Sequence, residues 1–246
     1  MNTILNSSRF NDSIDLIIGM NRGAVIYVIF AGPSVEDNLR VLKQRGVPRG
    51  TITIGINRGA VHWEAVMGEP VDYFLLADGS ITEEMCRRLW GGLPHYRNGV
   101  FCNWVDPGMV TEALTYWFRC SGLGHEQVYT GTPLSLPALE YSYNTGTMSL
   151  HLADFLGASE IHLIGADFAL PGGKFHTDEV AYFKDHRNAM CCEDIEGKLI
   201  MCREDQFCAA RKMETWAYIL STYGVKVVNR TGAGQLKRFM EQVPFK

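Results

Sequence analysis

Polar side chains follow several short apolar runs of this chain at the point where each run ends. Asp167 comes shortly after the run 161–165, and Asn57 and Asp78 directly follow two other runs. Such runs predict buried strands, and side chains at the carboxyl ends of parallel strands face the ligand cleft of an open α/β sheet. Carboxylates bind Mg²⁺ or accept a proton. The pattern therefore predicts Asp167 as a catalytic residue, Asp167 and Asp78 as magnesium ligands, and Asn57 and Asp78 as nucleotide-binding residues.

A purely structural role is the alternative for each of these residues. Turn chemistry alone favours asparagine and aspartate at the positions of Asn57 and Asp78. A buried carboxylate at Asp167 can hydrogen-bond a neighbouring loop without taking part in any reaction.

A second candidate is Gly32-Pro33-Ser34, which opens a predicted helix after the apolar run 24–30. Amide groups at a helix N-terminus, together with the Ser34 hydroxyl, can hold a phosphate or a sugar. The alternative is that Ser34 only caps the helix, with Asp37 completing a capping box. The triplet is neither a Gly-x-Gly-x-x-Gly dinucleotide fingerprint nor a Walker loop.

A third candidate, Asn144-Thr145-Gly146, supplies an amide, a hydroxyl and an unobstructed backbone at the predicted start of another helix. This combination suits a nucleotide phosphate, although a threonine cap beside a flexible glycine explains it too. Lys174 and His176 lie in a glycine-rich loop that can close over a ligand. There Lys174 would neutralise phosphate and His176 would act as a general base; an ordinary solvated loop is the equal alternative.

Composition bounds the functions open to this chain of 246 residues. Its formal net charge of −4 gives no bulk attraction to nucleic acid, so nucleic-acid binding is not expected. No apolar run approaches the roughly 18–20 residues of a membrane span, and the polar N-terminus lacks the pattern of a secretory signal. Seven scattered cysteines, without zinc spacing, favour a reducing compartment. We expect a cytoplasmic protein that binds a small-molecule nucleotide donor; the acceptor and any homo-oligomer stay open.

The order of apolar and amphipathic stretches predicts the fold class. Strands and helices alternate, which is typical of a doubly wound, mostly parallel Rossmann-like α/β sheet with helices on both faces. Residues 1–20 are predicted as an N-terminal arm and 21–246 as one transferase domain with a small hairpin insertion near 192–202. Strands are expected at 24–30, 51–56, 73–77, 100–104, 161–165 and 225–228, and helices at 34–45, 83–89, 110–118, 148–156 and 204–223.

Several motifs, in their order along the chain, resemble those of the MptE-like family, whose namesakes are archaeal 6-hydroxymethylpterin diphosphokinases. These motifs span residues 31–34, 56–57, 144–147, 163–169, 176–177 and 227–232. The family is similar in turn to flagellin glycosyltransferases of the motility-associated-factor type and to GT-A-like sialyltransferases, which use CMP-activated acidic sugars. The resemblance implies a nucleotide-binding transferase with its site over Gly32, Asn57, Asp78, Thr145, Gly146 and Asp167.

Three functions are therefore considered. The first is pyrophosphoryl transfer from a nucleoside triphosphate to a small hydroxymethyl acceptor, with Mg²⁺ as a cofactor. The second is glycosyl transfer from a CMP- or UDP-sugar, and the third is a non-catalytic nucleotide-binding module. Ala169 and Phe175 stand where the sialyltransferases place tyrosines, and their lid histidine has no counterpart beyond His186. These departures favour the diphosphokinase-like branch.

Overall fold

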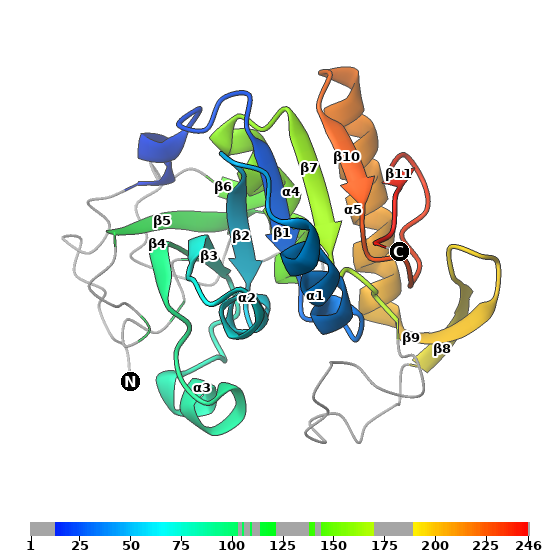
Figure 1. Ribbon diagram of the computed structural model, residues 1–246, viewed down its shortest axis with the longest axis horizontal. Helices are drawn as coiled ribbons and strands as arrows, with labels where there is room; N and C mark the ends of the chain where they lie inside the picture. Colours follow the sequence, from blue (N-terminus) through cyan, green and yellow to red (C-terminus); the bar gives the residue numbers. More distant parts are fainter. Residues whose placement is uncertain are drawn as a thin grey trace.

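The computed structural model describes residues 13–102, 105, 109, 114–121, 138–140, 144–169 and 189–245. Within this part of the chain, nine strands form one sheet in the order β11-β10-β7-β1-β2-β3-β4-β5-β6, and all of its strand pairs are parallel (Figure 1). The strands are β1 (Val25–Ile29), β2 (Ile52–Ile56), β3 (Val71–Leu76), β4 (Tyr96–Cys102), β5 (Leu114–Ser121), β6 (Ala138–Glu140), β7 (Glu160–Ile164), β10 (Lys226–Asn229) and β11 (Glu241–Gln242).

The strand order reverses beside β1. From β1 the chain adds β2 to β6 on one side, and β7 then returns to pair with the opposite side of β1. Such a reversal separates the loops that follow the two strands and opens a crevice at their carboxyl ends. The ends of β1 and β7 are therefore the first place to look for a ligand.

Helices cover both faces of the sheet (Figure 1). α1 (Val35–Arg45) and α2 (Gly59–Met67) lie on one face, and α4 (Thr145–Leu156) and α5 (Glu204–Thr222) lie on the other. Because neither face meets water, β1 and β7 are largely apolar, and Ile26, Val28 and Leu163 are fully buried. The predicted doubly wound α/β fold is confirmed.

Two smaller elements also match the sequence analysis. The predicted hairpin is formed by β8 (Ala189–Glu193) and β9 (Leu199–Arg203), which are antiparallel and turn at Gly197. α3 (Glu83–Trp90) begins where the Thr82 hydroxyl accepts a hydrogen bond from the Met85 amide at 3.2 Å. The short 3₁₀ helix η2 (Ile14–Ile17) packs two buried isoleucines onto the body; residues 1–12 of the predicted arm lie outside the described part.

Two predictions about elements were wrong, and one helix was not predicted. The expected helix at 110–118 is replaced by strand β5, because aromatic Tyr116 and Trp117 fit a pleated surface paired with β4. The strand expected at 100–104 begins earlier, at Tyr96. Helix α2 was not predicted, because its sequence has one charged residue, Glu64, and so little polar periodicity; its buried face includes His62 and Trp63.

Candidate functional site

The loops after β1 and β7 meet through one carboxylate. Asp167 follows β7, and its Oδ2 accepts hydrogen bonds from the backbone amide of Ser34 (3.2 Å) and from the Ser34 hydroxyl (2.8 Å). A Cβ atom added to Gly32 would overlap both Asp167 Oδ2 and the carbonyl oxygen of Gly165. The chain therefore needs glycine at position 32 to bring the two loops this close.

The contact with Asp167 changes the interpretation of Ser34 at the α1 N-terminus. Ser34 has helical backbone angles and its side chain makes no capping hydrogen bond, so the capping-box alternative with Asp37 was wrong. The Ser34 amide and hydroxyl, predicted to hold phosphate, are instead directed at Asp167. Glu36 and Asp37 add negative charge to the first turn of α1. The Asp167 carboxylate consequently occupies the position at this helix N-terminus where a phosphate would bind.

Two further side chains support this contact. The Asn38 side-chain amide, one turn along α1, donates to the Ser34 hydroxyl oxygen and to the carbonyl oxygen of Thr231, both at 3.1 Å. The Thr231 hydroxyl accepts a hydrogen bond from the Ala166 amide at 2.9 Å. The loop after β10 is thereby tied to the loops after β1 and β7.

Asp167 is only 1% exposed, and the polar environment of its two oxygens differs. Oδ2 has the two Ser34 donors, whereas Oδ1 is buried and has no hydrogen-bond partner among the residues that the structure describes. Burial raises the pKa of the Asp167 carboxyl, and the hydrogen bonds from Ser34 act against that rise. A buried carboxylate oxygen without a partner is costly unless another donor meets it.

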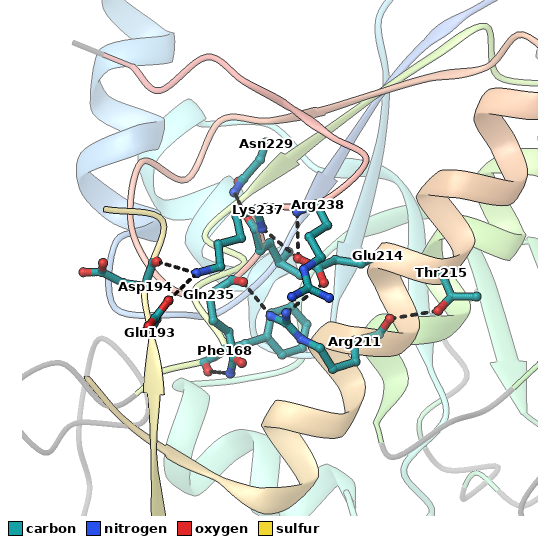
Figure 2. Close-up of polar contacts among 11 residues, drawn as sticks. Phe168, Glu193, Asp194, Arg211, Glu214, Thr215, Asn229, Gln235, Lys237 and Arg238 are labelled. Atoms are coloured by element: carbon teal, nitrogen blue, oxygen red, sulfur yellow. Dashed lines mark hydrogen bonds and ion pairs between the residues drawn. The ribbon is translucent and has the colours of Figure 1, made fainter. Parts of the chain in front are cut away.

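The backbone after Asp167 makes an unusual turn. Phe168 has a φ of 49°, in the left-handed region that residues other than glycine rarely adopt. The Gln235 amide donates to the Asp167 carbonyl oxygen at 3.1 Å, and the Gln235 side chain donates to the Phe168 carbonyl oxygen (Figure 2). The C-terminal loop thus holds both carbonyl groups of this turn.

Asn57 ends β2, on the other side of β1 from Asp167. Its φ of 48° is also left-handed, and its Oδ1 is buried without a hydrogen-bond partner within the described part of the chain. β7 and β2 are separated by β1 alone, so their ends lie about 10 Å apart. Two buried oxygen atoms to which no described residue donates therefore flank the end of β1.

Asp78, at the end of β3, has a different environment. It is exposed, and its Oδ1 accepts hydrogen bonds from the amide and the hydroxyl of Ser80, at 2.9 and 2.6 Å. Three strand spacings, about 14 Å, separate β3 from β7. Across the described residues, no three His, Cys, Asp or Glu side chains are grouped as metal ligands. Magnesium binding by Asp78 and Asp167 stays a prediction.

The N-terminus of α4 lies behind the end of β1. The Asn144 side chain caps this helix by accepting from the Thr147 amide at 3.3 Å, and the first turn holds no acidic residue. A Cβ atom on Gly146 would come within 2.7 Å of the Phe30 ring, so glycine allows the helix to approach β1. Thr145 is buried beside it. The predicted set Asn144, Thr145 and Gly146 therefore opens a helix that packs against the end of β1.

The structure leaves some predicted residues untested and adds others. Lys174 and His176, together with His186, lie outside the described residues. Asn38 and Gln235 were missed, because polar residues in a helix and in a loop carry no sequence signal for partners far along the chain, whereas Thr231 belongs to the motif at 227–232. For the described helices, none has both the length and the apolar character needed to span a membrane.

The site belongs to a doubly wound α/β fold that also occurs in a solved glycosyltransferase structure. No protein-family model matches the sequence, and no curated protein sequence matches it. Among solved structures, the MAf glycosyltransferase from Magnetospirillum magneticum AMB-1 is similar, with a TM-score of 0.64 over 97% of this chain and 14% identity. This chain spans 38% of the length of that protein.

A second structure is more distant. The sialyltransferase CstII from Campylobacter jejuni, in complex with a substrate analogue, cytidine-5'-monophosphate, gives a TM-score of 0.49 and 11% identity over 91% of this chain and 86% of that one. At such low identities, the likeness to the MAf glycosyltransferase establishes the fold. Membership of the MptE-like family is not shown and stays a resemblance.

Proposed function

We propose that this chain binds a nucleotide-activated sugar at the carboxyl ends of β7, β1 and β2 and transfers the sugar to an acceptor. The observation that carries the proposal is the Asp167 carboxylate, which is buried at the reversal of strand order with its Oδ1 unpartnered among the described residues. The glycosyltransferase fold of the MAf protein supports it. We therefore favour glycosyl transfer over pyrophosphoryl transfer from a nucleoside triphosphate.

The chemistry of the β1 edge suits hydroxyl groups. Asp167 Oδ1 and Asn57 Oδ1 are both acceptors without donors in the described part of the chain. A ribose or a hexose carries several hydroxyl donors, and a nucleoside is long enough to bridge oxygens about 10 Å apart. A ligand hydroxyl on Asp167 Oδ1 would remove the cost of leaving that atom unpaired.

The phosphate is proposed to bind at α4 rather than at α1. The first amide groups of a helix lack intrahelical partners and attract an anion. At α1 that position is taken by Asp167 and flanked by Glu36 and Asp37, whereas the first turn of α4 carries no acidic residue. Asn144, Thr145 and Gly146 would then surround the phosphate of the donor.

The proposed reaction replaces one bond by another at the anomeric carbon. The bond between that carbon and a phosphate oxygen of the nucleotide breaks, and the oxygen keeps the electron pair. An acceptor oxygen forms the new bond and releases its proton. The amide groups of α4 would stabilise the charge that develops on the departing nucleotide.

A thermal-shift panel tests the proposal. The wild-type protein is measured with CMP, CDP, UDP and GDP, and with ATP plus Mg²⁺. A ligand present at 100 times its Kd stabilises the folded state by about 2.7 kcal/mol. We expect CMP or UDP to raise the Tm without added metal, and we expect the matching nucleotide sugar to release free nucleotide over time.

A matched pair of variants assigns the site. Asp72 resembles Asp167, because its Oδ2 accepts from the amide and the hydroxyl of one residue, Thr53, both at 2.9 Å. It lies near the amino end of β3, however, and so far from the proposed cleft. Asp167→Ala should abolish the nucleotide-induced shift and Asp72→Ala should keep it. Stabilisation by ATP and Mg²⁺ alone would instead support the diphosphokinase, and a nucleotide shift that survives Asp167→Ala would refute the assigned site.

A further inference from the structure

We propose that Gln235 is the positioning residue that aims the Asp167 carboxylate at the ligand. This inference rests on the proposed function, because it concerns the same site. Gln235 is fully buried, lies 68 residues beyond Asp167 in the sequence, and belongs to the loop after β10.

Gln235 holds the turn at two successive carbonyl groups. Its backbone amide donates to the Asp167 carbonyl oxygen at 3.1 Å, and its side-chain Nε2 donates to the Phe168 carbonyl oxygen. With both carbonyl oxygens fixed, the peptide plane after Asp167 has a single orientation. The direction of the Asp167 side chain depends on that plane, since the side chain leaves the Cα atom just before it.

The turn needs an external clamp because its own backbone does not favour it. Phe168 adopts a left-handed φ of 49°, which a bulky residue avoids unless its surroundings impose it. Gly234 packs directly on the Asp167 backbone, where an added Cβ atom would overlap the Asp167 carbonyl group. Two consecutive loop residues, Gly234 and Gln235, therefore contact the turn, and only Gln235 has a side chain.

Gln235 is itself anchored by side chains of α5. The Arg211 guanidinium donates to the Gln235 carbonyl oxygen at 2.7 Å and pairs with Glu214 at 2.9 Å (Figure 2). Glu214 is 3% exposed, and its Oε1 accepts hydrogen bonds from the amides of Lys237 and Arg238, at 2.9 and 2.8 Å. α5 thus holds the loop at Gln235 and at the two residues Lys237 and Arg238 beyond it, and the loop holds the turn.

A purely structural role is the rival explanation, and a matched control separates the two. Gln206 is also a buried glutamine, but its side chain accepts from the Arg203 amide at the start of α5. Replacing either glutamine by methionine keeps the length of the side chain and removes its hydrogen bonds. Gln235→Met and Gln206→Met should therefore lose similar stability, while only Gln235→Met should alter the behaviour of Asp167.

The first readout needs no ligand. ¹³C NMR of carboxyl-labelled protein, with Asp167→Asn to assign the signal, follows the titration of Asp167 in each variant. Burial is the first cause of the raised pKa of this group. A loosened turn admits water, so Gln235→Met should move the titration midpoint toward the ordinary value for aspartate, and Gln206→Met should leave it where the wild type has it.

The second readout is the affinity for CMP and UDP, measured by calorimetry. We expect Gln235→Met to weaken the nucleotide that binds the wild type by at least tenfold, with Gln206→Met unchanged. If Gln235→Met does not fold, Gln235→Asn is measured instead. The asparagine side chain keeps the polar amide group but is one methylene shorter, so it cannot reach the Phe168 carbonyl oxygen. An Asp167 titration and an affinity that match those of Gln206→Met would overturn the inference. A wild type that binds neither nucleotide would defeat the proposed function alone, because the Asp167 titration would still decide the role of Gln235.

Discussion

Two aspartates of this protein have nearly the same hydrogen-bond donors and lie toward opposite ends of the sheet. Asp167, after β7, accepts from the amide and hydroxyl of Ser34, and Asp72, at the start of β3, accepts from the amide and hydroxyl of Thr53. Their second oxygens differ. Oδ1 of Asp72 pairs with Arg97 at 3.4 Å, whereas Oδ1 of Asp167 has no partner within the described residues.

The difference separates a structural carboxylate from a candidate binding group. Asp72 lies toward the amino ends of the strands, where both of its oxygens are satisfied and its side chain is 22% exposed. Asp167 lies at the carboxyl ends, beside the reversal of strand order, and is almost completely buried. Of these two carboxylates, only the one at the carboxyl edge has a buried oxygen without a partner among the described residues, and this contrast favours that edge as the ligand site.

The largest effect should come from filling the space between the loops of β1 and β7. In Gly32→Ala the new methyl group would overlap Asp167 Oδ2 and the Gly165 carbonyl oxygen, so the loops must separate. We expect a loss of about 3 kcal/mol in the free energy of unfolding, as for overpacked sites, together with the loss of nucleotide binding. Urea denaturation and the thermal-shift panel measure the two effects.

Gly68→Ala is the control for that substitution. Gly68 has a left-handed φ of 82°, but an added Cβ atom would meet no atom within 4 Å. Only backbone strain remains, at about 1 kcal/mol. Equal losses in the two variants would mean that the contact between Gly32 and Asp167 is not tight, and the comparison of the two edges would lose its basis.

The sequence identified the edge but not the partners. Asp167, Ser34 and Asn57 were predicted because each follows a buried apolar run, and that pattern depends only on local order. The same pattern selected Asp78, whose partner is Ser80, two residues away. Asp167 and Ser34 are 133 residues apart, and their contact depends on β7 returning to the side of β1.

The missed residues have the same physical cause. Gln235 acts on the turn through two backbone carbonyl groups, and any sequence has such groups, so nothing at positions 167 and 168 indicates a partner. Helix α2 and strand β5 were missed or wrong because each has few charged residues, so neither shows the polar periodicity that distinguishes a helix from a strand. Strands with plain apolar runs, by contrast, were predicted to within one or two residues.

A pH series gives the next largest effect. The raised pKa of Asp167 means that, above the ordinary value of 3.8, the folded protein keeps a proton that the unfolded chain has lost. Rising pH then favours the unfolded state, by up to about 1.4 kcal/mol per pH unit, until the folded group ionises too. Asp167→Asn has no such proton, so the stability of the wild type relative to this variant should fall as pH rises above 3.8.

Urea denaturation at closely spaced pH values, at constant ionic strength, measures that difference. A difference that is flat or that rises with pH over this window would contradict the burial of an ionisable group at position 167. Nucleotide added to the wild type should reduce the slope, because a hydroxyl donor on Oδ1 stabilises the carboxylate.

The smallest effect compares the hydroxyl donors of the two aspartates. Ser34→Ala removes the 2.8 Å hydrogen bond to Asp167, and Thr53→Val removes the 2.9 Å hydrogen bond to Asp72 at nearly constant volume. Each leaves a buried or half-buried carboxylate with one donor fewer, at a cost of about 1–2 kcal/mol. The two losses of stability should therefore be similar, while only Ser34→Ala should weaken nucleotide binding.

The Ser34 hydroxyl also opposes the rise of the Asp167 pKa, so its removal should extend the falling part of the pH series to higher pH. Weakened nucleotide binding in Thr53→Val, or unchanged binding in Ser34→Ala, would contradict this comparison. It would show that the two aspartates do not differ in the way that their second oxygens indicate.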